Sequence, residues 1–435
     1  MAKVGRPKKI KYQSPKGMHD LLPEDFEYFQ KIFDVCDKIA KFYGFSRIET
    51  PILEQAALFT KGVGKDTDIV EKQMYILETK GGDVLALRPE YTASVIRAFI
   101  EKGMEVLPRP VKLWSFGPCF RYEKPQAGRF RQFHHFNFEV LGEQSPVIDA
   151  QIIQIFWNIL EELKLKNLLL QINSIGEPKC RAHYKKILIG YLKSYQRALC
   201  TDCKRRLKRN PLRILDCKNE ECQRIVAQGP QIIDYLCKEC RSHFKEVLEF
   251  LDVLEIPYRL NPYLVRGLDY YTKTIFEIFM ANSLAELDST QVALVGGGRY
   301  DVLSKILGGK DTPGCGAAAG VERIMDLMRE KEFKVRREKP PQIFLAQLGA
   351  LAKRRALVLF EEFRRAKLPV YETFSKDSLK AQLARANRLG ARYTLILGQK
   401  EALKEKIILR DMEKGTQKAL GLGKIVATMK KKLKK

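Results

Sequence analysis

Four arginines stand beside strand-like or glycine-rich sequence: Arg121, Arg129, Arg266 and Arg323. A guanidinium is permanently charged and presents a planar fork of N–H groups that suits phosphate oxygens. Several such forks around one site can stabilise a phosphoryl transition state without a covalent nucleophile. For any one of these arginines taken alone, pairing with a structural acid is the favoured interpretation. The same stretches also supply two acids and a tyrosine pair, Glu90, Glu139, Tyr270 and Tyr271. That combination favours a phosphate-handling site.

The segment RFRQFHHFNFEV, residues 129–140, predicts a strand with two unlike faces. Side chains alternate across a strand, so one face carries Arg129, Arg131, Phe133, His135, Asn137 and Glu139. The opposite face carries Phe130, Gln132, His134, Phe136, Phe138 and Val140. An ordinary solvated face is rich in Lys, Thr and Glu. The first row is therefore unusual for a solvated face, and the phenylalanines of the second row predict a core face.

Several common catalytic motifs are missing from the sequence. It contains no G-x-x-x-x-G-K-[ST], no G-x-G-x-x-G after a strand, no H-E-x-x-H and no G-x-S-x-G. This argues against a P-loop enzyme, a dehydrogenase, a zincin and an α/β-hydrolase.

The cysteines include two C-x-x-C pairs, CTDC at 200–203 and CKEC at 237–240, with Cys217 and Cys222 between them. Paired C-x-x-C motifs suit a tetrahedral zinc site, which would place structural Zn²⁺ on Cys200, Cys203, Cys237 and Cys240. The spacing exceeds that of a usual zinc ribbon, so reduced thiols without a metal are the alternative.

The formal net charge of +26 is concentrated in a leader at 1–16, a tail at 430–435 and the segment 178–248. This distribution indicates a polyanionic partner, most simply nucleic acid. No apolar run is long enough to span a membrane, and the leader lacks the apolar core of a secretory signal. We therefore expect a cytoplasmic protein with reduced thiols.

Alternating strand and helix patterns predict two folded domains. Residues 17–335 should form a mostly antiparallel sheet with flanking helices, and residues 178–248 a helical, basic, cysteine-rich insertion. Beyond the linker RREKPPQ, residues 341–425 read as a small α/β domain. Residues 1–16 are expected to be a disordered leader and residues 426–435 a basic tail.

Five ordered motifs resemble those of class II aminoacyl-tRNA synthetases. FSRIETPILE resembles motif 1, FRYEKPQAGRFRQFHHFNFE motif 2 and PGCGAAAGVERI motif 3. RPEYTA and LVRGLDYYTKTIFE are similar to the two signatures of the histidyl-tRNA synthetase family, and RRLKRNPLRILDCK resembles the insertion of its bacterial type. The resemblance implies an α+β fold: a class II antiparallel sheet flanked by helices, with a C-terminal α/β domain like an anticodon-binding module.

The resemblance also implies roles for individual residues. Arg121 would contact the α-phosphate and the histidine carboxylate, and Arg266 would approach the α-phosphate as the catalytic arginine. ATP would further be held by Glu123, Arg129, Phe133 and Arg323. Histidine would be held by Glu90, Thr92, His135, Glu139, Tyr270 and Tyr271. Gln126, in the motif 2 loop, is assigned to the tRNA acceptor end.

The implied reaction is ATP-dependent activation of L-histidine, assisted by Mg²⁺, and transfer of the histidyl group to tRNA(His) by a homodimer. The alternative is a paralogue that keeps the fold but acts as a regulatory or nucleic-acid-sensing subunit without charging tRNA. His135 stands where the family usually has Gln. Because Glu139 and Glu90 should favour its protonated form, we expect the KM for histidine to rise as the pH falls from about 8 to about 6.

Overall fold

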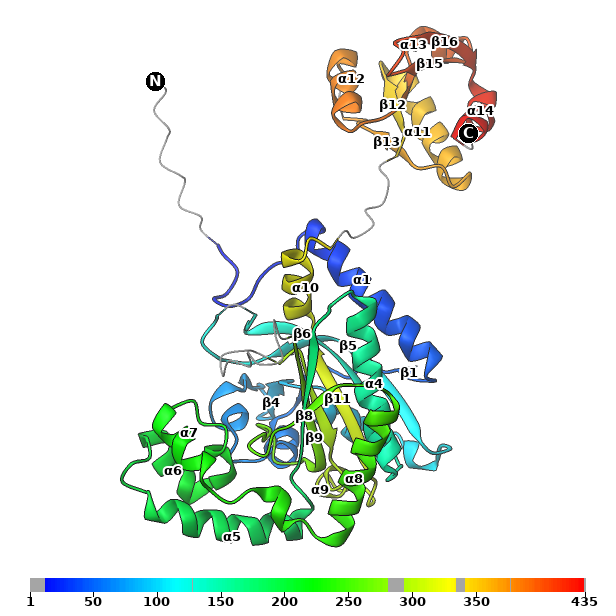
Figure 1. Ribbon diagram of the computed structural model, residues 1–435. Helices are drawn as coiled ribbons and strands as arrows, with labels where there is room; N and C mark the ends of the chain where they lie inside the picture. The colour runs from blue at the N-terminus through cyan, green and yellow to red at the C-terminus, as the bar shows by residue number, and fades with distance from the viewer. Residues whose placement is uncertain (1–11, 127, 281–292, 334–340, 376, 434–435) are drawn as a thin grey trace. The chain divides into compact units, whose positions relative to one another are not determined.

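The computed structural model describes residues 12–126, 128–280, 293–333, 341–375 and 377–433 (Figure 1). Residues 1–11, most of the expected leader, lie outside the described residues. The chain divides into two compact units, Met1–Val335 and Arg336–Lys435.

The first unit is built on an eight-stranded sheet. Its order is β1 (Ser46–Arg47), β5 (Val111–Phe120), β6 (Gln132–Leu141), β11 (Gly314–Gly320), β10 (Val295–Arg299), β9 (Thr272–Met280), β7 (Leu168–Ser174) and β8 (Tyr258–Leu260). The two outermost pairs, β1–β5 and β7–β8, are parallel, and every inner pair is antiparallel. This confirms the predicted antiparallel sheet.

Helices cover the two faces of this sheet unequally. One face packs against α1 (Pro23–Phe42), α4 (Pro146–Glu162), α8 (Lys238–Val253) and α10 (Val321–Glu330), which share a large apolar core with the strands. Helix α1 forms because its apolar residues recur at three- and four-residue steps, so that Ile32, Val35, Cys36, Ile39 and Ala40 are all buried. Its start is fixed by Pro23 and by Asp25, whose carboxylate accepts from the Leu22 N–H at 2.8 Å.

The second core lies on the opposite face and holds α2 (Ala56–Gly62), α3 (Thr92–Glu101) and α9 (Leu303–Ile306) together with the insertion. A three-stranded sheet precedes α3, in the order β2 (Leu53–Gln55), β4 (Val84–Leu87) and β3 (Ile76–Glu78). Two short helices complete this region, the π-helix η1 (Ile69–Gln73) and the 3₁₀ helix η2 (Met104–Val106). Helix α3 begins at Thr92, so its first turn carries the RPEYTA motif to the sheet.

The insertion is helical, as predicted, but it ends earlier than residue 248. It consists of α5 (Pro178–Ser194), α6 (Thr201–Arg209), η3 (Pro211–Ile214), α7 (Glu220–Ala227) and η4 (Ile232–Tyr235). Helix α8 instead belongs to the main core, where Phe244, Val247 and Leu251 are buried. Its His243 also contacts Asp149 of α4 at 3.2 Å, and Asp149 pairs with the buried Arg299 of β10 at 2.8 Å. Figure 1 shows α5, α6 and α7 gathered on the side of the sheet away from α1.

The second unit is the predicted α/β domain. Its sheet has the order β13 (Val370–Glu372), β12 (Ile343–Gln347), β14 (Tyr393–Leu397), β15 (Lys406–Asp411) and β16 (Gln417–Gly421). One face packs on α11 (Ala350–Arg365), α13 (Gln399–Leu403), η5 (Leu422–Lys424) and α14 (Ile425–Leu433), and the other on α12 (Leu379–Arg388). Residues 425–433, mostly expected as a tail, form α14 because Ile425 and Met429 are buried one helical turn apart in the core.

Within the described residues, no helix combines the length and the apolar character needed to cross a bilayer.

Candidate active site

A cavity of about 810 Å³ lies over strands β6, β9, β10 and β11 and is closed on one side by the insertion. The predicted site residues that line it are Glu90, Thr92, Arg121, Glu123, Arg129, Phe133, His135, Arg266, Tyr270, Tyr271 and Arg323. Glu139 is buried beside the cavity, and its carboxylate accepts from the Thr92 hydroxyl at 2.8 Å. Gln126 is exposed in the β5–β6 loop, where its backbone pairs with that of Arg129.

The two faces of β6 follow the predicted alternation. Phe133, His135 and Asn137 point to the cavity, whereas Phe136 and Phe138 lie in the core shared with α1 and α4. Phe130 departs from the prediction because it precedes the strand, which begins at Gln132. It lines the cavity, and its ring packs edge-on against His19 at 4.7 Å.

Three arginines form a cationic end of the cavity. Arg121 donates through Nε to the Pro89 carbonyl at 3.0 Å, and its guanidinium lies 5.3 Å from the centre of the Phe133 ring. Arg323 donates to the carbonyls of Gly128 at 2.9 Å and Ala293 at 2.7 Å. Burial, followed by repulsion from Arg129 and Arg121, lowers the pKa of Arg323 to about 10. The cations therefore repel one another and would gain from an anion bound between them.

Arg266 is held differently, by an ion pair with Glu277 of β9. Burial alone would lower the pKa of Arg266, but the Glu277 carboxylate together with Tyr271 and Tyr270 outweighs burial and raises it. The Nη atoms of the guanidinium lie against Gly296 of β10, where any Cβ would collide with them. The GGGRY segment, residues 296–300, thus lets the long Arg266 side chain approach the sheet backbone closely.

Two buried acids form the opposite, acidic part of the site. The Glu90 carboxylate accepts from the backbone N–H groups of Thr92 at 2.7 Å and Ala93 at 2.8 Å, at the start of α3. Burial raises the pKa of Glu90 and raises that of Glu139 to about 8, because hydrogen bonds only partly offset the lost hydration. Glu139 accepts from Tyr300 as well as Thr92, and it lies over Gly316, which has no room for a Cβ.

The expectation that His135 is readily protonated is wrong. Its pKa is lowered well below the ordinary value, first by burial and then by Arg121, Arg323, His134 and Arg266. The sequence shows Glu139 two residues along the same strand, but it does not show that three arginines from other segments surround the ring. Nδ1 of His135 is buried and has no hydrogen-bond partner within the described part of the chain. A neutral imidazole with one unused nitrogen is available for a ligand.

Sequence reasoning missed three site residues. Tyr300 ends the GGGRY motif, and Glu277 follows the RGLDYY signature on β9. Glu322 lies in motif 3, lines the cavity and accepts from the His134 N–H at 2.9 Å. Glu277 and Glu322 lie inside motifs identified in the sequence, but the sequence did not show which side chains they contact.

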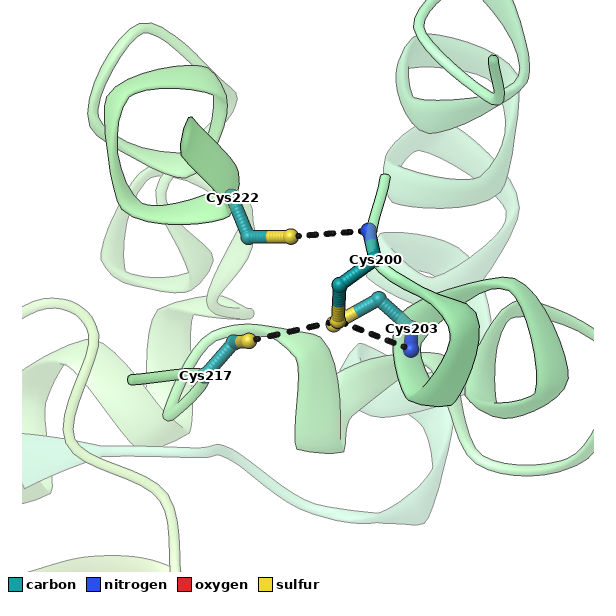
Figure 2. Close-up of side chains that lie close together, drawn as sticks. All are labelled: Cys200, Cys203, Cys217 and Cys222. Atoms are coloured by element: carbon teal, nitrogen blue, oxygen red, sulfur yellow. Dashed lines mark hydrogen bonds between the residues drawn. The ribbon is translucent and has the colours of Figure 1, made fainter. Parts of the chain in front are cut away.

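The predicted zinc ligands are wrongly paired. Cys200 and Cys203 lie with Cys217 and Cys222 (Figure 2). Cys237 and Cys240 instead lie with Cys180. The two C-x-x-C motifs begin two different helices, α6 and α8, and each meets other cysteines there.

Comparisons with known proteins give a consistent picture. The sequence model of Histidyl-tRNA synthetase matches residues 17–176 and 214–324, and that of the Anticodon binding domain matches 342–432. The chain is 42% identical over 422 residues to the histidine–tRNA ligase of Dehalococcoides mccartyi, covering 97% of this chain and 100% of that one. It is 46% identical over 410 residues to the histidine–tRNA ligase of Desulfitobacterium hafniense, covering 94% and 96%. The crystal structure of apo S. aureus histidyl-tRNA synthetase superposes with a TM-score of 0.77 at 32% identity, covering 96% and 99%.

Proposed function

Because this chain belongs to the histidyl-tRNA synthetase family, we propose that its cavity is where ATP activates L-histidine to histidyl-adenylate before transfer to tRNA(His). The observation that supports this most directly is the division of the cavity into a cationic end and an acidic pocket. ATP and the histidine carboxylate are anions, whereas the α-ammonium of histidine is a cation. One cavity offers guanidinium groups to the anions and, at its other end, two carboxyl groups whose ionisation a bound ammonium would favour.

In the activation step a histidine carboxylate oxygen attacks the α-phosphorus of ATP, an acyl–phosphate bond forms, and the bond to pyrophosphate breaks. The protein must bring two anions together and neutralise charge. Arg121 lies between the Phe133 ring and the start of α3, so it can contact both the α-phosphate and the carboxylate. Arg266 approaches the same phosphate, and its pairing with Glu277 fixes its direction before substrate arrives.

The remaining arginines and Phe133 would bind the outer phosphates and the adenine of ATP. Arg129 and Arg323 face the outer phosphates, which would relieve the repulsion between them. Phe133 stacks on the adenine, and Glu123, 3.6 Å from Arg129, contacts the adenine amino group.

The acidic pocket accounts for histidine. Glu90 and Thr92, held at the start of α3, bind the α-ammonium. Glu139 and the neutral His135 face the polar atoms of the substrate, and Tyr270 and Tyr271 line the imidazole pocket. Tyr300 keeps the Glu139 carboxylate in one orientation.

The residues at the cationic end also fit a magnesium ion, because Mg²⁺ favours one or two carboxylates together with substrate phosphates. Glu123 and Glu277 line this end of the cavity, where their charges act to raise the pKa of Arg323, and they are the carboxylates that would hold the ion. When bound, the ion neutralises charge on the phosphates.

The C-terminal α/β unit is proposed to bind the anticodon region of the tRNA, as the matched domain's name indicates. Gln126 is proposed to meet the acceptor end because it is exposed next to Arg129 at the cavity.

Pairing of two chains is proposed through the three-stranded sheet, where Leu53, Ile76, Leu77 and Val84 expose apolar side chains. Sedimentation equilibrium of the full chain and of a Leu53→Asp variant tests that pairing. The proposed location is the cytoplasm.

Histidine-dependent ATP–pyrophosphate exchange tests the activation step, and charging of tRNA(His) tests the transfer. Exchange that requires histidine and no other amino acid is the expected result. Exchange without charging would favour the regulatory alternative, and absence of both would contradict the proposal.

A further inference from the structure

Four cysteines of the insertion converge on one point between short helices. We call Cys200, Cys203, Cys217 and Cys222 the four-cysteine cluster (Figure 2). All four sulfurs lie within 4.8 Å of one another, and three of the residues are buried. Cys200 and Cys203 come from the start of α6, Cys222 from the first turn of α7, and Cys217 from the segment between η3 and α7.

The separation of the sulfurs fits a shared metal better than a covalent bond. A tetrahedral Zn²⁺ with Zn–S bonds of about 2.3 Å places its sulfurs about 3.8 Å apart. The sulfurs of Cys200 and Cys217 are 3.9 Å apart. A disulfide would require about 2.0 Å, and all four cysteines are free thiols.

Backbone N–H groups also point at these sulfurs. The Cys203 N–H donates to the sulfur of Cys200 at 3.5 Å, and the Cys200 N–H donates to that of Cys222 at 3.3 Å. Cys200 is the N-cap of α6, and Asn219, the N-cap of α7, accepts from the Cys222 N–H at 3.1 Å. Helix N-termini and N–H donors stabilise thiolates, which are the form that binds metal.

The surroundings suit the charge that such a site would carry. Four thiolates and one divalent ion have a net charge of −2. Lys204, Arg205 and Arg206 follow Cys203 directly, and Lys218 follows Cys217. Three acids adjoin these cysteines in the sequence. Asp202 and Asp216 are paired with arginine, at 2.8 Å to Arg205 and 2.7 Å to Arg213, and Glu221 is exposed to solvent.

We propose that the four-cysteine cluster binds one Zn²⁺ ion in a closed, tetrahedral, structural site. Four thiolates without an open position match structural rather than catalytic zinc, and soft thiolates disfavour Mg²⁺ and Ca²⁺. Cys200 and Cys203 lie in the 177–213 gap of the matched family model, so half of the ligand set falls outside that match.

The second cysteine group gives an internal control. Cys180, Cys237 and Cys240 repeat the arrangement, with Cys237 as the N-cap of α8 and sulfurs of Cys180 and Cys240 3.9 Å apart. Within the described residues, no fourth Cys, His, Asp or Glu joins this group, and Cys237 is exposed. The lower number of ligands predicts weaker binding there.

The ion would fix one wall of the active-site cavity. Cys217 and its neighbours Asp216 and Lys218 line that cavity. From the same segment, Arg213 pairs with Asp68 at 3.4 Å, and Asn210 donates to Asp269 of the RGLDYY signature at 3.1 Å. The ion therefore holds the insertion against the loop that carries Arg266.

Metal analysis of the full chain, purified under reducing conditions without chelators, tests the proposal. Native protein and a Cys237→Ser/Cys240→Ser variant should each retain zinc near one per chain. A Cys217→Ser/Cys222→Ser variant should lose it, while Cys36→Ala, which removes a buried thiol elsewhere, should not.

Two measurements on the unmutated protein test the proposal without relying on a variant that could misfold. Reduced, metal-depleted protein titrated with Co²⁺ should develop the thiolate charge-transfer and intense d–d bands of a tetrahedral four-sulfur site, saturating at one equivalent. Chelation should make residues 195–230 sensitive to protease, and Zn²⁺ should restore protection, because metal binding and local folding are coupled. The proposal is overturned if native protein binds no metal tightly, if iron is found in place of zinc, or if only Cys237→Ser/Cys240→Ser removes the ion.

Discussion

The active-site cavity and the four-cysteine cluster both gather side chains that repel one another, but they are held in different ways. In the cavity, Arg121 and Arg323 are fixed by backbone carbonyls, and Glu90 by the N–H groups that begin α3. In the cluster, the contacts of the sulfurs with other described residues are long N–H···S hydrogen bonds and sulfur–sulfur contacts. The cavity is thus organised before substrate arrives, whereas we propose that the cluster depends on a bound ion.

This contrast follows from the elements that carry the residues. The cavity residues lie on or beside long antiparallel strands, whose ladders of hydrogen bonds set the side-chain directions. The cysteines lie at the ends of short helices, which are marginal without tertiary support. A preorganised site should tolerate loss of one side chain without unfolding, but an ion-dependent site should not.

Loss of Arg266 should have the largest effect on the preorganised site. Arg266→Ala should lower histidine-dependent ATP–pyrophosphate exchange by about 100-fold or more, because it removes a charge aimed at the reacting phosphate. The melting temperature should change little. Arg329→Ala, which removes an ion pair with Asp25 on the surface of α10, is the matched control and should retain activity. Exchange near that of the wild type would contradict the catalytic role.

Removal of the second unit should separate the two activities, because it leaves the active-site cavity complete. A chain ending after residue 338 should retain exchange, because every proposed adenylation residue lies upstream and the first unit has its own cores. Its charging of tRNA(His) should fall about 30-fold, the equivalent of about 2 kcal/mol of lost tRNA contact. Equal loss of both activities would show that the two units do not divide the work in this way.

The pH dependence of the unfolding free energy should reveal the cost of burying the Glu139 carboxylate in the cavity. Its pKa of about 8 in the folded protein lies above that of an unfolded carboxyl, so its contribution to stability is complete below the unfolded pKa and is lost as the pH rises through about 8. Between pH 7 and 9 the wild type should lose about 1.4 kcal/mol of unfolding free energy relative to Glu139→Gln.

Urea denaturation of both proteins across that interval measures the difference, in which the contribution of the neighbouring Glu90 largely cancels. Glu330→Gln, at an exposed position at the end of α10, should show no such trend. A difference that stays constant with pH would mean that Glu139 is ionised throughout.

The smallest effect is expected at His135. Burial and the nearby arginines lower the pKa of His135 well below its ordinary value, which favours the neutral imidazole. His135→Gln should therefore shift the KM for histidine by less than about twofold between pH 8 and pH 6. The KM–pH curves should superimpose when measured in one buffer series, since the substrate titrates equally in both. A wild-type KM that rises more steeply at low pH than that of the variant would restore the earlier expectation.

The sequence was sufficient for the sheet and for most residues of the cavity, because the alternation along β6 and the motif order are local patterns. It was insufficient where partners come from distant segments. The surroundings of His135, the pairing of the cysteines and the burial of Ile425 and Met429 all depend on which helices and loops meet in space. Spacing along the chain identifies a C-x-x-C motif, but it does not say which helix end lies opposite.

The glycines beneath Arg266 and Glu139 have a consequence for inherited variation. Gly296 and Gly316 have no functional group, yet a single added methyl at either would displace a side chain on which substrate binding is proposed to depend. A saturation screen for growth should therefore find these two positions among the least permissive in β10 and β11, although neither would be recognised from its chemistry.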